Sequence, residues 1–136
     1  HVLVKEKKYF SNIECYHYGS TDAGLLCIEG KIVKGVDIHV AEKAVDELVE
    51  QMKNELVAET ELQKVKNKTE SMMAFEDMGL MNRANSLAYY EILGDAAWMN
   101  FELDKYASVT TEDILQESRT IFRKENSNTL YYLSNN

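Results

Sequence analysis

The sequence predicts an α+β fold in which an antiparallel sheet has helices packed on one face. Residues 9–33 hold two runs rich in aromatic and β-branched side chains, separated by a glycine-bounded turn, which is typical of a β-hairpin. Between residues 38 and 123 the apolar side chains recur every three or four positions, which indicates helices. An apolar run at 128–133 predicts a last strand that returns to the sheet. Strands first and helices afterwards favour this class over alternating α/β units.

The hairpin has an expected register. A turn centred near Thr21 places Cys15 opposite Cys27 and Tyr16 opposite Leu26. The two cysteines match no zinc or redox spacing. We expect them to be small buried apolar residues, because free cysteine is among the most buried residue types.

The helical part is divided by residues that begin or end helices. Short polar side chains bond the backbone amides that the start of a helix leaves unpaired, and glycine readily adopts the left-handed conformation that ends a helix. The expected signals, in chain order, are a cap at Asp37, a capping box at Thr60 and Gln63, a stop at Gly79, a third helix over 83–93 with a stop at Gly94, a cap at Asp95 and a capping box at Thr110 and Asp113.

The apolar positions of the second helix are expected to face inward. Its methionines are expected to fill gaps in a core rather than to form a binding surface. The positions concerned are Leu62, Val65, Thr69, Met72 and Phe75, with Met73, Met78 and Met81 nearby.

Charge and hydropathy exclude two partner classes. The formal net charge is −8, from 23 acidic and 15 basic residues without a basic block, so a phosphate backbone would be repelled. No apolar run approaches the roughly 20 residues that span a bilayer. The chain opens with His1 and an apolar, strand-like run rather than with methionine. We therefore expect it to be part of a longer protein, which leaves both cytoplasm and periplasm open as its compartment.

Six segments resemble insulinase/pitrilysin-type zinc peptidases, in the order and at about the spacing of that family. Together they run from Val4 to Leu133, and each alone has little specificity. The segments are VKEKKYFSNIECY, GLLCIEGKIVKG, ETELQKVKNK, NRANSLAYYEILGD, YASVTTEDILQESRTIF and NTLYYL.

The resemblance implies that residues 1–136 are a single domain, the C-terminal part of an inactive repeat of such a peptidase. Its half-domain would be of the LuxS/mitochondrial-processing-peptidase type, with a strand pair at 9–33, helices at 38–123 and a strand at 128–133. Repeats of this family enclose a chamber for unfolded peptides. One repeat of each pair carries the inverted zinc motif H-x-x-E-H, and the other supplies the opposite wall.

This chain departs from the family pattern at two places. Lys8 and Tyr9 replace the Gly-Leu pair that often precedes the first strand. Family members grip the substrate backbone with an arginine and a tyrosine, but no arginine precedes Arg83 here, so neither role is assigned. Tyr16 and Tyr18 are the nearest candidates for such a substrate-binding tyrosine.

One near-match to a zinc motif occurs in the chain. His39, Glu42 and Lys43 spell H-x-x-E-K, and Glu117 lies far downstream. A peptidase zinc site needs three protein ligands, and a protonated lysine cannot serve as one. We expect no metal ligands, catalytic residues or cofactor in this chain, and the isolated His17 is expected on a strand surface. Zinc is implied for the parent enzyme only.

The sequence therefore predicts a non-catalytic segment of a zinc-dependent peptidase that helps to form the peptide-binding chamber. Its expected partners are the catalytic half-domain or subunit that carries H-x-x-E-H, and an unfolded peptide. The alternative is a peptidase-derived assembly protein without catalytic activity. Because a sheet that lacks its first strands leaves an unpaired edge, we also expect self-association through that edge.

Overall fold

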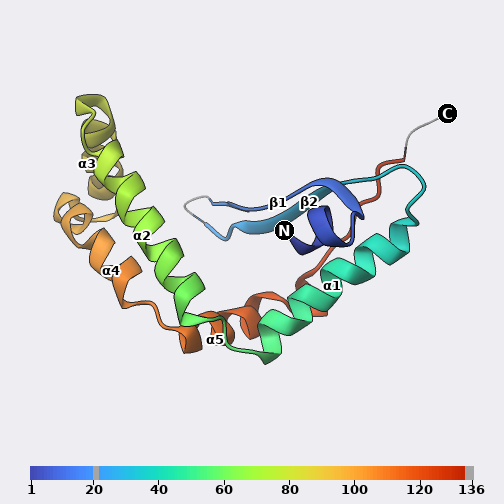
Figure 1. Ribbon diagram of the computed structural model, residues 1–136. Coiled ribbons are helices and arrows are strands. Elements are labelled where there is room, and N and C mark those ends of the chain that lie inside the picture. Colours follow the sequence, from blue (N-terminus) through green and yellow to red (C-terminus); the bar gives the residue numbers. More distant parts are fainter. Residues whose placement is uncertain (20–21, 134–136) are drawn as a thin grey trace. The chain divides into compact units, whose positions relative to one another are not determined.

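The computed structural model describes residues 1–19 and 22–133, and it has the predicted α+β class (Figure 1). Its contacts group into two compact units, His1–Gln51 and Met52–Asn136. No helix among the described residues is long and apolar enough to cross a membrane. That residues 1–136 form a single domain stays a prediction.

The first unit packs a hairpin against two helices. A short π-helix, η1 (Val2–Glu6), precedes β1 (Phe10–Tyr18) and β2 (Leu25–Ile32), and α1 (Ile38–Asn54) follows. The α1 residues buried in the core are the small side chains Ala41 and Ala44, and Ala41 is completely buried. The buried core consists of Leu3, Phe10, Ala41 and Ala44, flanked by Val4, Tyr9, Ile13, Ile32, Val36 and Val45. The expected strand-like opening of the chain is therefore wrong, because these residues turn helically and bring Leu3 into the core.

The hairpin register differs from the expected one by one residue. Cys15 pairs with Ile28 and Tyr16 pairs with Cys27. Tyr18 pairs with Leu25, so an even number of loop residues separates the strands and the turn has no single central residue. Thr21, the expected centre, lies outside the described residues.

A β-bulge at the start of β1 changes the pairing between the two strands. The pairing shifts between Phe10, opposite Ile32, and Asn12, opposite Lys31. A bulge inserts one extra residue into one strand and so changes which of its side chains share a face. As a result Phe10 and Ile13 both point into the core, on the same side as Gly30. A regular strand would have placed them on opposite faces.

The second unit is helical. It contains α2 (Glu59–Glu76), α3 (Leu80–Leu93), the 3-10 helix η2 (Ala96–Phe101), α4 (Glu102–Ser108), α5 (Thr111–Ile121) and the short η3 (Lys124–Asn126). Contacts join α2 to α4, α3 to η2 and η2 to α4.

Most of the expected helix ends are confirmed. Asp37 Oδ1 accepts hydrogen bonds from the amides of His39 and Val40, at 2.9 and 3.2 Å, so it caps α1. Asp95 accepts from the amide of Ala97, and Thr110 and Asp113 form a reciprocal capping box on α5. At the end of α3, Gly94 has φ = +139°, a conformation that favours glycine.

Three expected helix boundaries are wrong. The start of α2 has Ala58 at the N-cap without a side-chain hydrogen bond, so Thr60 and Gln63 form no capping box. Gln63 instead donates its amide to Asn67, one turn along the helix, at 2.8 Å. The helix ends at Glu76, before Gly79, and α3 begins at Leu80 rather than at Arg83.

The inward face expected for α2 is formed only in part, because Thr69 and Met73 are half-buried beyond the first turn. Leu62 is buried, whereas Val65, Met72 and Phe75 are exposed, Phe75 by 74%. Met78 and Met81 are exposed as well, so the expectation that these methionines fill a core is wrong.

The expected closing strand over 128–133 is not formed. These residues have no regular secondary structure, and the sheet of the described residues has two strands. An apolar run becomes a strand only where another strand offers its backbone groups.

Candidate functional site

The register sorts the hairpin side chains into two faces, because residues directly opposite each other in an antiparallel pair point to the same side of the sheet. The bulge keeps Phe10 on the side of Ile13 and Gly30. We use "apolar face" for Phe10, Ile13, Cys15, His17, Leu26, Ile28, Gly30 and Ile32, and "tyrosine face" for Asn12, Glu14, Tyr16, Tyr18, Leu25, Cys27, Glu29 and Lys31.

Both predicted substrate-binding tyrosines lie on the tyrosine face and are open to solvent. Tyr16 is 44% exposed and Tyr18 is 68% exposed. The Tyr16 hydroxyl donates to Glu29 Oε2 at 3.3 Å. The nearby Cys27 and then Glu29 raise the pKa of Tyr16. This face therefore offers aromatic surface and hydrogen-bonding groups to an extended ligand.

The cysteines are free thiols on opposite faces. Cys15 is exposed and Cys27 is half-buried, so the expectation that both are buried is wrong. No further strand of the described residues covers this part of the hairpin. Partial desolvation and then the neighbouring Cys27 raise the pKa of the Cys15 thiol. A thiol with a raised pKa is a poor nucleophile at neutral pH, since the thiolate is the reactive form.

His17 lies in β1 beside the hairpin turn and is exposed, as expected. A Cβ atom added at Gly19 would lie 2.8 Å from the ring carbon Cε1, and one added at Gly24 would lie 2.7 Å from Nε2. The ring therefore rests against the two glycines that bound the turn, and a side chain at Gly24 would also meet the Tyr18 carbonyl oxygen at 2.7 Å.

The near-match to a zinc motif does not provide a metal site. His39 Nδ1 lies 3.5 Å from Glu42 Oε2 on the surface of α1, one helical turn apart. Lys43 follows where the second histidine of the motif would stand. No group of three or more histidine, cysteine, aspartate or glutamate side chains in the described part of the chain could hold a metal ion. Zinc does not fit these residues, because a peptidase site needs three protein ligands.

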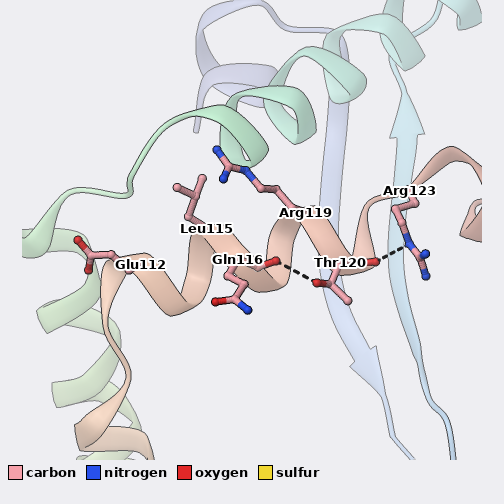
Figure 2. Close-up of a pocket in the computed structure, with 6 residues that line it drawn as sticks. All are labelled: Glu112, Leu115, Gln116, Arg119, Thr120 and Arg123. Atoms are coloured by element: carbon pink, nitrogen blue, oxygen red, sulfur yellow. Dashed lines mark hydrogen bonds between the residues drawn. The ribbon is translucent and has the colours of Figure 1, made fainter.

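An open pocket of about 590 Å³ runs along α5 (Figure 2). Its lining is Glu112, Leu115, Gln116, Arg119, Thr120 and Arg123. Sequence reasoning did not single it out, although the spacing of three and four residues places its members along one side of a helix.

Both arginines of this pocket are engaged by backbone carbonyls. Arg119 Nε donates to the carbonyl of Lys53, in the last turn of α1, at 2.8 Å. Arg123 Nε donates to the carbonyl of Thr120, near the end of α5, at 2.9 Å. Cations in these places stabilise helix C-termini. Figure 2 shows the two guanidinium groups pointing away from each other, so they do not form a clamp for one anion.

A second cavity, of about 260 Å³, lies among α2, α3, η2 and α4. Thioether, carboxylate and neutral polar groups line it together. Its residues are Thr69, Met72, Met73, Glu76, Asp77, Asn82, Ser86, Met99, Glu102 and Tyr106.

The chain was compared with family models, curated proteins and solved structures. No family model matches the sequence, and no curated protein matches it. The crystal structure of a protease from Helicobacter pylori matches with a TM-score of 0.77 and 15% sequence identity, over 87% of this chain. This chain has the fold of the matching part of that structure. It covers 29% of that protease chain, so the likeness concerns less than a third of the larger protein.

Proposed function

We propose that this chain is a non-catalytic segment of a zinc-dependent peptidase of the insulinase/pitrilysin type and helps to form its peptide-binding chamber. The observation that carries the proposal is the protease-like fold over 87% of the chain. The six sequence segments that resemble this family, in its order, support the same assignment.

In this proposal the tyrosine face contacts the peptide. An unfolded substrate has free backbone amides and carbonyls, and it needs binding groups that accept many side chains. Tyrosine provides large contact area with few rotatable bonds, and its hydroxyl can donate or accept. The exposure of Tyr16 and Tyr18 on one face of the hairpin supports this role.

Hydrolysis is assigned to a partner. The catalytic half-domain or subunit with an intact H-x-x-E-H would hold the zinc, which activates water and polarises the peptide carbonyl. This chain would contribute confinement of the peptide and no ligand to the metal. His39 and Glu42 remain a surface pair in this scheme.

The primary test compares the chain with the full-length product of its gene. Each is assayed for cleavage of an unfolded peptide, with and without a zinc chelator. We expect chelator-sensitive cleavage by the full-length product and none by the chain. Metal-dependent cleavage by the chain itself would overturn the non-catalytic role. If neither protein cleaves the peptide, even with a catalytic partner subunit present, the alternative of an assembly protein without catalytic activity would be favoured.

A second test addresses the tyrosine face. Tyr16→Ala and Tyr18→Ala are combined, and binding of a labelled unfolded peptide to the whole chain is followed by fluorescence anisotropy. Loss of two aromatic contacts, at about 1 kcal/mol each, should weaken binding by roughly thirtyfold. Tyr132→Ala is the matched control, because Tyr132 is 95% exposed and lies outside the hairpin. Equal effects from the control and the double variant would remove the tyrosine face from the proposal.

A further inference from the structure

The outer edge of β2 is unpaired in the described structure. β2 forms its ladder with β1 alone, in a two-stranded sheet. An unpaired edge offers a row of amides and carbonyls that can template another strand. The β2 edge also differs from the β1 edge in its side chains, and this difference indicates what can pair with it.

The backbone identifies which residues of β2 face outward. The Val33 amide donates to the Tyr9 carbonyl at 3.0 Å, and the Lys31 carbonyl accepts from the Ser11 hydroxyl at 3.1 Å. Both groups therefore point toward β1. Along an antiparallel strand alternate residues direct their backbone groups to the same side. The even-numbered residues, from Leu26 to Ile32, consequently direct theirs to the free edge.

This parity restricts how a second copy of β2 can pair with the first. Hydrogen-bonded pairs across a two-fold axis must join even-numbered residues, so the axis passes through one residue of the strand. With the axis at Gly30, Glu29 of one copy lies opposite Lys31 of the partner, and the reverse pair forms as well. Both pairs are of the non-hydrogen-bonded type, in which side chains approach most closely.

The other registers allowed by parity lack this match. An axis at Glu29 places two carboxylates opposite each other, and an axis at Lys31 places two ammonium groups together. An axis at Ile28 or Ile32 leaves every charge of the strand without an opposite partner. The Gly30 register alone pairs all four charges of the two strands with opposite sign.

The same register improves the apolar face. Ile28, which is 41% exposed, would pair with Ile32 of the partner. The two hairpins would form a four-stranded sheet, and a two-stranded hairpin gains stability from further strands and an apolar face. By contrast, β1 carries one formally charged side chain, Glu14, so self-pairing through its edge cannot match opposite charges.

We propose that the β2 edge is a homodimer interface in which two copies of this chain pair antiparallel about Gly30, held in register by two Glu29–Lys31 pairs. The proposal is independent of the proposed function, since it rests on the hydrogen-bond directions and charges of β2 alone.

Charge reversal tests it. The dimer dissociation constant of the whole chain is measured by sedimentation equilibrium for the wild type, Glu29→Lys, Lys31→Glu and the double swap. We expect each single variant to weaken the dimer at least about tenfold, because two attractive pairs become repulsive. The double swap should restore the wild-type constant. A wild type that stays monomeric at about 1 mM, or a double swap as weak as the single variants, would overturn the proposal.

Two controls separate this effect from unfolding or another edge. Glu29 lies opposite Glu14 within the hairpin, so Glu29→Lys replaces two like charges with an opposite-charge pair. The hairpin should therefore stay folded, and the circular dichroism spectrum should not change. Glu14→Lys changes a charge on β1 and should leave the dimer intact. Monomers whose Ile28 and Gly30 amides resist hydrogen exchange would show that another segment of the chain covers this edge, and would refute the dimer.

Discussion

A side chain at Gly30 should destabilise the first unit by overfilling its core. A Cβ atom built there lies 2.6 Å from both Cδ1 and Cε1 of Phe10 and 3.4 Å from Ile13 Cγ1. Carbon atoms pack at about 3.5–4.0 Å, so the buried ring must move by about 1 Å. Overpacking of this kind costs about 1–3 kcal/mol, while replacing a glycine inside a strand recovers about 0.5–1 kcal/mol. We expect Gly30→Ala to lower the free energy of unfolding by about 1 kcal/mol.

The assay is urea denaturation at one fixed protein concentration, since association would shift the midpoint. The midpoint should fall with little change in slope. Phe10→Leu removes the contacted ring atoms, so the double variant should lose less stability than the two single variants summed. Gly35→Ala is the control: Gly35 has φ = +89° and nothing within 4 Å of its Cβ position, so Phe10→Leu should not rescue it. An undiminished midpoint for Gly30→Ala, or equal rescue of both variants, would refute the steric reasoning.

Three further predictions use other contacts. Thr110→Ala removes the side-chain acceptor of the α5 capping box and should cost about 1 kcal/mol in urea denaturation, whereas Thr110→Ser should cost little. Desolvation, and then the hydrogen bond to Glu102, raise the pKa of Tyr90 to about 12. This folded-state pKa exceeds the unfolded value of about 10. The contribution of protonated Tyr90 to the free energy of unfolding is therefore fully present below pH 10 and is lost between pH 10 and 12. Absorbance titration of the wild type should show a late-ionising phenol that Tyr90→Phe removes. Cys15 should alkylate more slowly than a free thiol at pH 8, and Cys27→Ala should speed it, because Cys27 contributes to the raised pKa; an unchanged rate would contradict this.

The helix ends that were predicted correctly depend on local signals. Asp37, Asp95 and Thr110 each act within three residues of themselves, and a cap needs only the backbone of its own helix. Gly94 ends α3 for an equally local reason, its positive φ. The failure at Thr60 is also local: Ala58 occupies the N-cap, so the threonine lies inside the first turn.

The candidate site was predicted in part. Tyr16 and Tyr18 were predicted as candidate substrate-binding residues, and the structure places both on one face of the hairpin. Their partners across the sheet were wrong, because Cys27 rather than Leu26 lies opposite Tyr16. Whether the two tyrosines bind a peptide stays a prediction. The α5 pocket was missed because its arginines resemble ordinary surface charges in sequence.

The sequence by itself determined the α+β class, the hairpin and the helix caps, since these depend on side-chain periodicity and on hydrogen bonds within a few residues. Only the tertiary structure decided the bulge at Phe10, the burial of Leu3 in a helical turn, the exposure of Phe75 and the absence of a strand at 128–133. Each of these depends on whether another element supplies a packing surface or a backbone partner. A one-residue change in strand pairing reverses which side chains meet the core, and periodicity alone does not encode that choice.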